Sequence, residues 1–287
     1  MIKRNKSFSN EKPLLYLLAT PIGNLDEFSP RAKDIISSSD FIACEDTRNT
    51  KKLISFFNIN KPLISLHEHN EKEMSLKVVE MIKEGKKISY VSDAGYPAIS
   101  DPGSILVKLA LENDINVSVI SGPNAALNAL VASGLESDHF YFHGFLPSKN
   151  SDRENELKEL QNKKETIIFY ESPHRIMDTL KSLYKELGDR QIVIARELTK
   201  IHEEYIHSNL KEIQEIEPST LIGEMVLIVE GNKIKEELSD EFIVKKALDL
   251  KEKAPNLTNK DISKILADQL NISKNKIYNL LIKDKEN

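Results

Sequence analysis

Short apolar runs alternate with helical periods along most of the chain, from residue 14 to about residue 231. A strand, helix and strand pattern that repeats four times requires crossover connections, so it predicts a mainly parallel sheet with helices on both faces. In the first half, the predicted strands are residues 14–19, 41–44, 63–66, 88–91 and 117–120. The predicted helices between them are residues 31–38, 47–58, 72–84 and 104–112.

The same rhythm restarts after residues 121–123. A predicted helix is followed by further strands and helices, namely helix 124–132, strands 140–143, 166–170, 192–195 and 225–229, and helices 153–161 and 176–187. This half matches the strand number of the first if residues 204–207 are also extended. The pattern therefore predicts two α/β domains, residues 13–122 and 123–232, with a ligand cleft between them.

The last segment, residues 233–287, has little β character and predicts a small helical appendage. Thr258 and Asp261 can cap the start of one helix, and Ser273 can cap the start of a second. This pattern fits a helix-turn-helix motif and fits a plain helical hairpin equally well, so both interpretations stay open. Over residues 257–287, six lysines outnumber four acidic residues, a weak bias that fits contact with phosphate.

The composition of the chain favours a soluble globular protein over a membrane protein or a secreted protein. Hydrophobic residues make up 40% and charged residues 30% of the chain, which is ordinary for a soluble globular protein, and no stretch approaches the roughly 18 apolar residues that span a bilayer. The polar, lysine-rich residues 1–12 predict a flexible tail and not a signal peptide. A single cysteine, Cys44, lies in an apolar run and fits the core of a cytoplasmic protein. The net charge of -5 argues mildly against a nucleic-acid partner but leaves room for a local basic patch.

Three turns rich in small residues follow strands of the first predicted sheet, at residues 19–25, 92–103 and 121–126. Because parallel strands end at the same edge, we expect the three turns to meet where ligands bind in open α/β sheets. No phosphate-binding P-loop and no dinucleotide GxGxxG pattern is present. His67, Glu68, His69 and Glu71 offer no third strong ligand beside the two histidines, so we expect a polar cleft wall and no metal site.

Charged segments also follow strand ends, at residues 45–48, 170–175 and 196–200. Dense charge at such positions costs stability unless the groups are paired or used, so each segment is either a salt-bridged helix start or part of a site.

At this level of detail the sequence resembles a known family, the ribosomal RNA small subunit methyltransferase I family of the tetrapyrrole-methylase-like (class III) superfamily. The resemblance covers residues 14–231 and is carried by the segments LLATPIGNLDEFSPRA, ACEDTRNTKKLISFF, SLHEHNE, YVSDAGYPAISDPG, SGPNAALNAL, FYESPHRI, ARELTKIHEE and GEMVLIVEG. Ser121 stands where proline is expected, and Tyr96 stands where threonine is commoner.

The resemblance implies a cytoplasmic homodimer, without a membrane partner, that binds S-adenosylmethionine between its two α/β domains. It implies 2′-O-methylation of a cytidine in the decoding region of 16S ribosomal RNA, either free or in the assembled 30S subunit. By similarity, the cofactor contacts are Pro21, Ser92, Asp93, Ala94, Gly95, Asn124, Ala125, Tyr170, Glu171 and Leu198.

The chemistry of such a transfer suggests further residues. The enzyme's main task is to align a weak nucleophile, the 2′-hydroxyl, behind an activated methyl group, and a general base or a nearby cation assists. The candidates for the base are Glu171 and Glu197, and the candidates for the cation are Arg175, Arg196 and Lys200. Two other interpretations compete: a methylase of a small tetrapyrrole, and a DNA-binding regulator without enzymatic activity. The lysine-bearing helical segment favours RNA over a small substrate.

Overall fold

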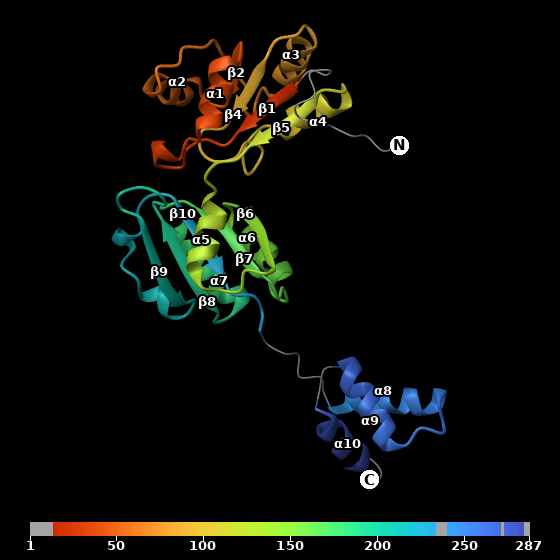
Figure 1. Cartoon of the computed structure of the whole chain (residues 1–287). Coiled ribbons are helices and arrows are strands. Elements are labelled where there is room, and N and C mark those ends of the chain that lie inside the picture. The colour runs from red at the N-terminus through yellow and green to blue at the C-terminus, as the bar shows by residue number, and fades with distance from the viewer. Residues whose placement is uncertain (1–13, 234–239, 271–272, 284–287) are drawn as a thin grey trace. The chain divides into compact units, whose positions relative to one another are not determined.

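The computed structural model describes residues 14–233, 240–270 and 273–283, and the predicted tail at residues 1–12 lies outside this range (Figure 1). The chain divides into two compact units, Met1–Asn232 and Lys233–Asn287. The first unit contains two five-stranded sheets. The exact domain boundaries at residues 122 and 232 stay a prediction.

The first sheet is entirely parallel, with the strand order β3-β2-β4-β1-β5. This confirms the sheet that the sequence predicts. Its elements are β1 (Leu14–Leu18), α1 (Pro30–Ser38), β2 (Phe41–Cys44), α2 (Thr47–Phe56), β3 (Leu63–Ser65), α3 (Glu71–Lys83), β4 (Ile88–Val91), α4 (Ser104–Glu112) and β5 (Asn116–Ile120), with a short 3-10 helix, η1 (Leu25–Glu27), after β1.

The strands of this sheet are apolar along their whole length because both faces are covered. Alternate residues of a strand point to opposite faces, so Leu17 packs with Tyr90 towards α3 and α4, while Leu18 packs with Val91 towards α1 and α2. Cys44 is buried in the second of these clusters, as the sequence predicts. Figure 1 shows the helices on either side of the strands.

The second sheet is mixed, with the order β6-β7-β10-β8-β9. Only β6 and β7 are parallel, and every other pair is antiparallel. Its elements are α5 (Ala125–Ser133), β6 (Phe140–Phe145), α6 (Asn150–Leu160), β7 (Thr166–Glu171), α7 (Ile176–Leu187), β8 (Gln191–Arg196), β9 (Glu204–Asn209) and β10 (Met225–Val229), with short 3-10 turns η2 (Glu212–Glu215) and η3 (Pro218–Thr220) before β10. The extended segment expected at residues 204–207 is therefore confirmed as β9.

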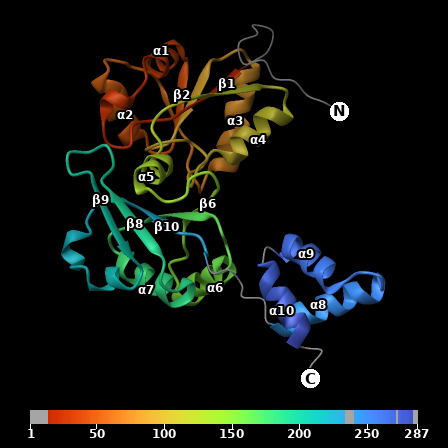
Figure 2. The same ribbon diagram turned by 60° about the horizontal axis from the view of Figure 1, so that its bottom comes forward.

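Two helical layers cover the second sheet (Figure 2). α5 packs on one face with Ile168, Val193 and Val226, while α6 and α7 pack on the other face around Phe169 and Leu227. Because α5 follows directly from β5 of the first sheet, residues 121–124 carry the chain from one sheet to the other.

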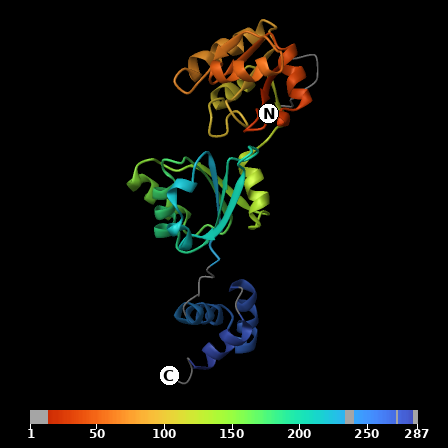
Figure 3. The ribbon, with the colours of Figure 1, turned by 90° about the vertical axis from the view of Figure 1, so that its left-hand side faces the viewer.

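The second unit consists of α8 (Asp240–Lys253), α9 (Asn259–Leu270) and α10 (Lys274–Lys283), shown in blue in Figure 3. The three helices share a core of their own, made of Ile243, Ala247, Ile262, Leu266, Ile277 and Leu281. The cap that the sequence predicts is present, because Thr258 N donates to Asp261 Oδ2 at 3.0 Å and Asp261 N donates to Thr258 Oγ1 at 3.3 Å. In the described ranges, no helix of the protein is both long and apolar enough to cross a bilayer.

Candidate active site

The three small-residue turns of the first sheet meet, as the sequence predicts. Thr20 and Gly95 exchange two backbone hydrogen bonds, Thr20 N to Gly95 O at 2.9 Å and Gly95 N to Thr20 O at 3.1 Å. The third turn joins them through Gly122, whose N–H donates to the Tyr96 hydroxyl at 3.2 Å. A side chain at Gly122 would come within 2.9 Å of the Ala19 Cβ atom, so the absence of a side chain there permits this close approach.

The second turn continues into a tight loop, residues 96–103, with two residues in the left-handed region, Ala98 at φ 66° and Ser100 at φ 60°. Such backbone conformations cost energy and persist only where surrounding contacts fix them. The fixing contacts are visible: Ala98 N donates to Pro102 O at 3.1 Å, and the buried Tyr90 hydroxyl donates to the same carbonyl at 2.8 Å. Glu71, also buried, accepts from Gly103 N at 2.8 Å. Side chains of β4 and α3 therefore fix the conformation of this loop.

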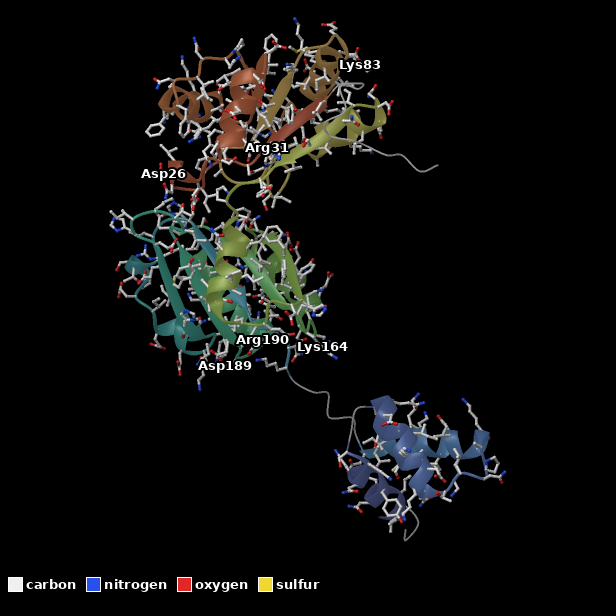
Figure 4. The ribbon with its side chains drawn as sticks, viewed as in Figure 1. Asp26, Arg31, Lys83, Lys164, Asp189 and Arg190 are labelled. Carbon is white, nitrogen blue, oxygen red and sulfur yellow. The ribbon has the colours of Figure 1, made fainter. Side chains whose placement is uncertain are left out.

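A pocket of about 370 Å³ lies between this loop and the second sheet, within the range of small-molecule sites. The first sheet contributes Ile22, Ala94, Gly95, Tyr96, Ile99, Ser100 and Asp101, and the rest of the lining is Asn124, Ala125, Phe145, Tyr170, Glu171, Ser172, Pro173, Leu198, Glu224, Met225 and Val226. Figure 4 marks the two ends of the first sheet: Asp26, beside the first turn, lies on the side of the second sheet, and Lys83 lies at the far end.

Most of the expected cofactor contacts line this pocket, namely Ala94, Gly95, Asn124, Ala125, Tyr170, Glu171 and Leu198. Three do not. Pro21 and Asp93 line a neighbouring pocket beside α2, and Ser92 is buried with its hydroxyl 3.3 Å from the Gly95 carbonyl oxygen. Asp93 accepts hydrogen bonds from Asp46 N at 3.2 Å and from Asn49 Nδ2 at 2.8 Å, so it ties the second turn to the start of α2.

Glu171 lies at the end of β7 and is 3% exposed. Both of its carboxylate oxygens are engaged: Oε1 accepts from Ser172 N at 2.8 Å, and Oε2 accepts from the Thr179 hydroxyl at 2.5 Å. Arg175 Nε lies 3.6 Å from Oε1, and Arg175 Nη2 donates to the Leu146 carbonyl at 2.5 Å. Both side chains are thus held by the turn that leads into α7.

The other three predicted catalytic side chains pair with each other or with nearby acids, outside the pocket lining. Arg196 Nε donates to Glu204 Oε2 at 2.5 Å across the β8–β9 ladder. Lys200 Nζ donates to Glu197 Oε1 at 2.9 Å and to Glu224 Oε2 at 3.1 Å. The hydrogen bond from Lys200 lowers the pKa of Glu197.

The turn that holds Glu197 and Lys200 packs directly against the first turn of the other sheet. A Cβ atom at Gly23 would lie 2.5 Å from Lys200 Cγ, 2.8 Å from Thr199 Oγ1 and 3.0 Å from the Leu198 carbonyl oxygen. The two turns therefore touch across the cleft without room for a side chain, and the contact closes one wall of the pocket.

Asp101 is a pocket residue that sequence reasoning did not single out. Burial raises the pKa of its carboxyl to about 6, and the charges of Glu45 and Asp93 add to this effect, while a hydrogen bond with Ser92 opposes it. Burial and the charge of Asp93 also raise the pKa of Glu45. The only sequence signal for Asp101 is its place in the second turn, directly before a proline and a glycine.

The histidine segment after β3 holds no metal centre in the part of the chain that the structure describes, where no group of three or more metal-ligating side chains occurs. Glu71 instead accepts hydrogen bonds from Gly103 N at 2.8 Å and Ile105 N at 2.9 Å at the start of α4, where the helix dipole favours a negative charge.

The pocket suits a cationic organic ligand. Three carboxylates line it, those of Asp101, Glu171 and Glu224, and none of its described lining residues is a lysine or an arginine. Aromatic rings of Tyr96, Phe145 and Tyr170 add surfaces that attract a cation or stack on a flat group. Small residues in the turns leave backbone groups accessible to such a ligand.

Comparisons with known proteins agree with this picture. The family model of the Tetrapyrrole (Corrin/Porphyrin) Methylases matches residues 14–214. The "Ribosomal RNA small subunit methyltransferase I" of Bacillus subtilis strain 168 is 42% identical over 286 residues, which cover 97% of this chain and 98% of that protein. The chain belongs to the ribosomal RNA small subunit methyltransferase I family. Another member, from Halalkalibacterium halodurans, is 48% identical to this methyltransferase over 229 residues, 79% of each chain.

A solved structure shows the fold of this methyltransferase in a more distant protein. A crystal structure of diphthine synthase superposes with a TM-score of 0.60, at 13% identity, and covers 76% of this chain and 89% of that chain. The likeness confirms the tetrapyrrole-methylase-like α/β fold, to which this protein adds the C-terminal helices α8, α9 and α10.

Proposed function

We propose that this methyltransferase transfers a methyl group from S-adenosylmethionine to the 2′-hydroxyl of a cytidine in the decoding region of 16S ribosomal RNA. The observation that carries the proposal is identity of 41–48% to relatives named for small-subunit ribosomal RNA methylation. The acidic pocket beside the three turns supports it, because a methyl donor of this kind carries a positive sulfonium.

The carboxylates, aromatic rings and small residues of the pocket fit the charge and chemistry of S-adenosylmethionine. When bound, this cofactor supplies an activated methyl group. Ala94, Gly95 and Ala125 allow it to approach the backbone, and Asn124, Tyr170 and Leu198 form the facing wall. Ser92 and Asp93 fix the second turn through their hydrogen bonds, and Pro21 lines the neighbouring pocket beside α2.

The charged groups around the pocket act mainly by holding its walls. Glu171 and Arg175 fix the turn into α7, and Arg196, Glu197 and Lys200 fix the turn that touches Gly23. Accurate alignment of two reacting groups supplies a large part of the rate enhancement in such transfers, so these residues matter for catalysis even where they touch no substrate.

The RNA strand approaches beside α2. This helix carries Arg48, Lys51 and Lys52 and no acidic residue, and Phe56 at its end is 61% exposed. Lys52 and Phe56 line the second pocket together with Pro21 and Asp93, and the turns that hold Pro21 and Asp93 also contribute residues to the first pocket. Cations for phosphate and an aromatic ring for a base are the combination that single-stranded RNA requires.

A homodimer is part of the proposal. Several apolar side chains of α5 and the edge strand β6 are exposed, foremost Val131 at 81%, Leu127 at 46% and Phe145 at 52%. α5 and β6 share one core cluster, in which Phe142 packs with Ala126 and Ala129. Exposed apolar surface of this kind is typical of an interface between subunits.

Transfer of labelled methyl groups tests the proposal. The protein is incubated with tritiated S-adenosylmethionine and either 30S subunits or free 16S RNA, both from cells that lack the modification. We expect label on one cytidine ribose, located by mass spectrometry of RNA fragments, with the better acceptor showing which form is the substrate. Label on a small tetrapyrrole instead, with none on RNA, would refute the proposal.

A further inference from the structure

The second pocket, of about 370 Å³, lies directly beside the first one. Pro21 and Asp93 line it, and the residues that follow them in the chain, Ile22 and Ala94, line the first pocket. Because consecutive Cα atoms are only about 3.8 Å apart, the two pockets lie on either side of the same two turns. A strand with one unit in the first pocket can therefore place a neighbouring unit in the second.

One side of α2 forms much of the lining of this second pocket. The residues on that side are three or four positions apart along the helix, so they lie above one another: Asn49, Lys52, Leu53 and Phe56. The helix packs on the first sheet through a different side, where Thr50 and Ile54 are buried. Leu25 of η1 adds apolar surface to the pocket. The hydrophobic core thus leaves this side of α2 open to a ligand.

Phe56 is held in place although most of its surface is exposed. Its ring meets the ring of Phe57 edge to face, with the centroids 5.0 Å apart, and Phe57 packs on the buried Phe28 with the centroids 5.4 Å apart. The side chain of Phe56 nevertheless stays 61% exposed. An exposed ring with a fixed position is a surface on which a nucleobase can stack, and every base has a flat face that allows this.

The cations of α2 suit the backbone of an RNA strand. Arg48 pairs with Asp46 at 2.6 Å, whereas Lys51 and Lys52 form no ion pair within the described ranges of the chain. The acid in the pocket lining, Asp93, accepts from Asp46 N at the start of the helix, about one and a half turns before Lys52. A phosphate can therefore bind Lys52 at a distance from this carboxylate.

We propose that the second pocket is a subsite for the base of a nucleotide next to the one that is methylated. The inference rests on the proposed function and deepens it. The base stacks on the ring of Phe56 beside Leu25 and Leu53, and Lys52 binds the phosphate of the same nucleotide. A base that stacks on a protein ring has left its own strand, so the enzyme requires an unpaired nucleotide here as well as at the target. Stacking tolerates any base, so the identity of this one has little effect.

The test is a double-mutant cycle between the protein and its RNA. 16S RNA is assembled by ligation with an abasic ribose on the 5′ or the 3′ side of the methylated nucleotide, and kcat and KM for methyl transfer are measured. We expect Phe56→Ala to lower kcat/KM on intact RNA by about 5–150-fold, through KM. One of the two abasic RNAs should lower wild-type kcat/KM by a similar factor. On that RNA, Phe56→Ala should have little further effect, because the contact is already absent.

Two variants serve as controls for the cycle. Phe56→Tyr keeps the ring and should retain the wild-type KM. Leu76→Ala shortens an apolar side chain that is 50% exposed on α3, and it should leave kcat/KM unchanged. The Kd for S-adenosylmethionine, measured by calorimetry, should be the same in every variant, because Phe56 lies outside the lining of the first pocket.

Three outcomes would overturn the subsite. The first is a Phe56→Ala variant with the wild-type KM for RNA. The second is an effect of Phe56→Ala that is equally large on intact RNA and on both abasic RNAs. The third is a change in sedimentation without a change in KM, which would assign the ring to a contact between two copies of the chain. Wild-type methyl transfer to intact RNA in the same assay leaves the proposed function intact in each case.

Discussion

At the scale of single residues, the charged groups around the pocket are held in place by hydrogen bonds and ion pairs. Glu171 is an example, since its carboxylate is buried and accepts from a backbone N–H and from the Thr179 hydroxyl. Removing one acceptor of a buried network leaves its donor without a partner, and the cost is a loss of stability.

Glu171→Gln therefore separates a structural role from a catalytic one. One carboxylate oxygen becomes an amide that can no longer accept from Thr179 or attract Arg175, so we expect the free energy of unfolding to fall by about 1–3 kcal/mol. Urea denaturation measures this, with the exposed Glu215→Gln as the matched control. A variant as stable as wild type but inactive would instead show that Glu171 acts on the substrate.

The sequence predicts which turns meet, but it does not predict which charged side chains around the pocket form ion pairs or hydrogen bonds. Turn positions follow from the alternation of strands and helices, and the meeting of Thr20 with Gly95 confirms them. The pairing of Arg196 with Glu204 depends on the register of β8 against β9, and the engagement of Glu171 depends on the first turn of α7. Neither pairing is visible in a linear pattern, because each depends on contacts between residues that only the fold brings together.

At the scale of secondary-structure elements, connection length explains why the two sheets differ. Each strand of the first sheet returns through a helix, which permits parallel pairing. Between β8 and β9 there are only residues 197–203, too few for a crossover, so these strands pair antiparallel. Repeated apolar runs predict the strands in both halves, whereas strand direction in the second half is set by these short connections.

α5 carries the proposal of a dimer, because Val131 and Leu127 are exposed on a helix whose other face is buried on the sheet. Val131→Asp should shift the protein from dimer to monomer in sedimentation velocity, because a charge cannot be buried in an interface without a partner. Leu76→Asp, on the exposed face of α3, is the control and should leave the dimer intact. A wild-type protein that sediments as a monomer at micromolar concentration would exclude this interface.

At the scale of the whole molecule, each unit has its own hydrophobic core. The clusters of the first unit end at Val229, and the cluster of the second begins at Ile243. Units with separate cores are expected to fold independently. The three-helix unit can therefore serve substrate recognition without contributing to the stability of the two sheets.

A chain that ends at Asn232 tests this division. It should unfold cooperatively and bind S-adenosylmethionine with the wild-type Kd, because every pocket residue is retained. Its affinity for 16S RNA should fall, because the lysines of α8, α9 and α10 are absent. Filter binding at a fixed salt concentration measures the RNA affinity. An unchanged affinity would assign RNA binding to the α/β unit alone.

The carboxylates inside the pocket have a consequence for the substrate strand. Asp101, Glu171 and Glu224 repel phosphates, and the cations of α2 lie outside the pocket lining. The phosphate backbone of RNA would therefore stay on the outer surface beside α2, and one uncharged ribose would enter the pocket. This distribution of charge favours a nucleoside that is flipped out of its strand. It disfavours a free nucleotide, because the phosphate of a free nucleotide would have to enter the acidic pocket.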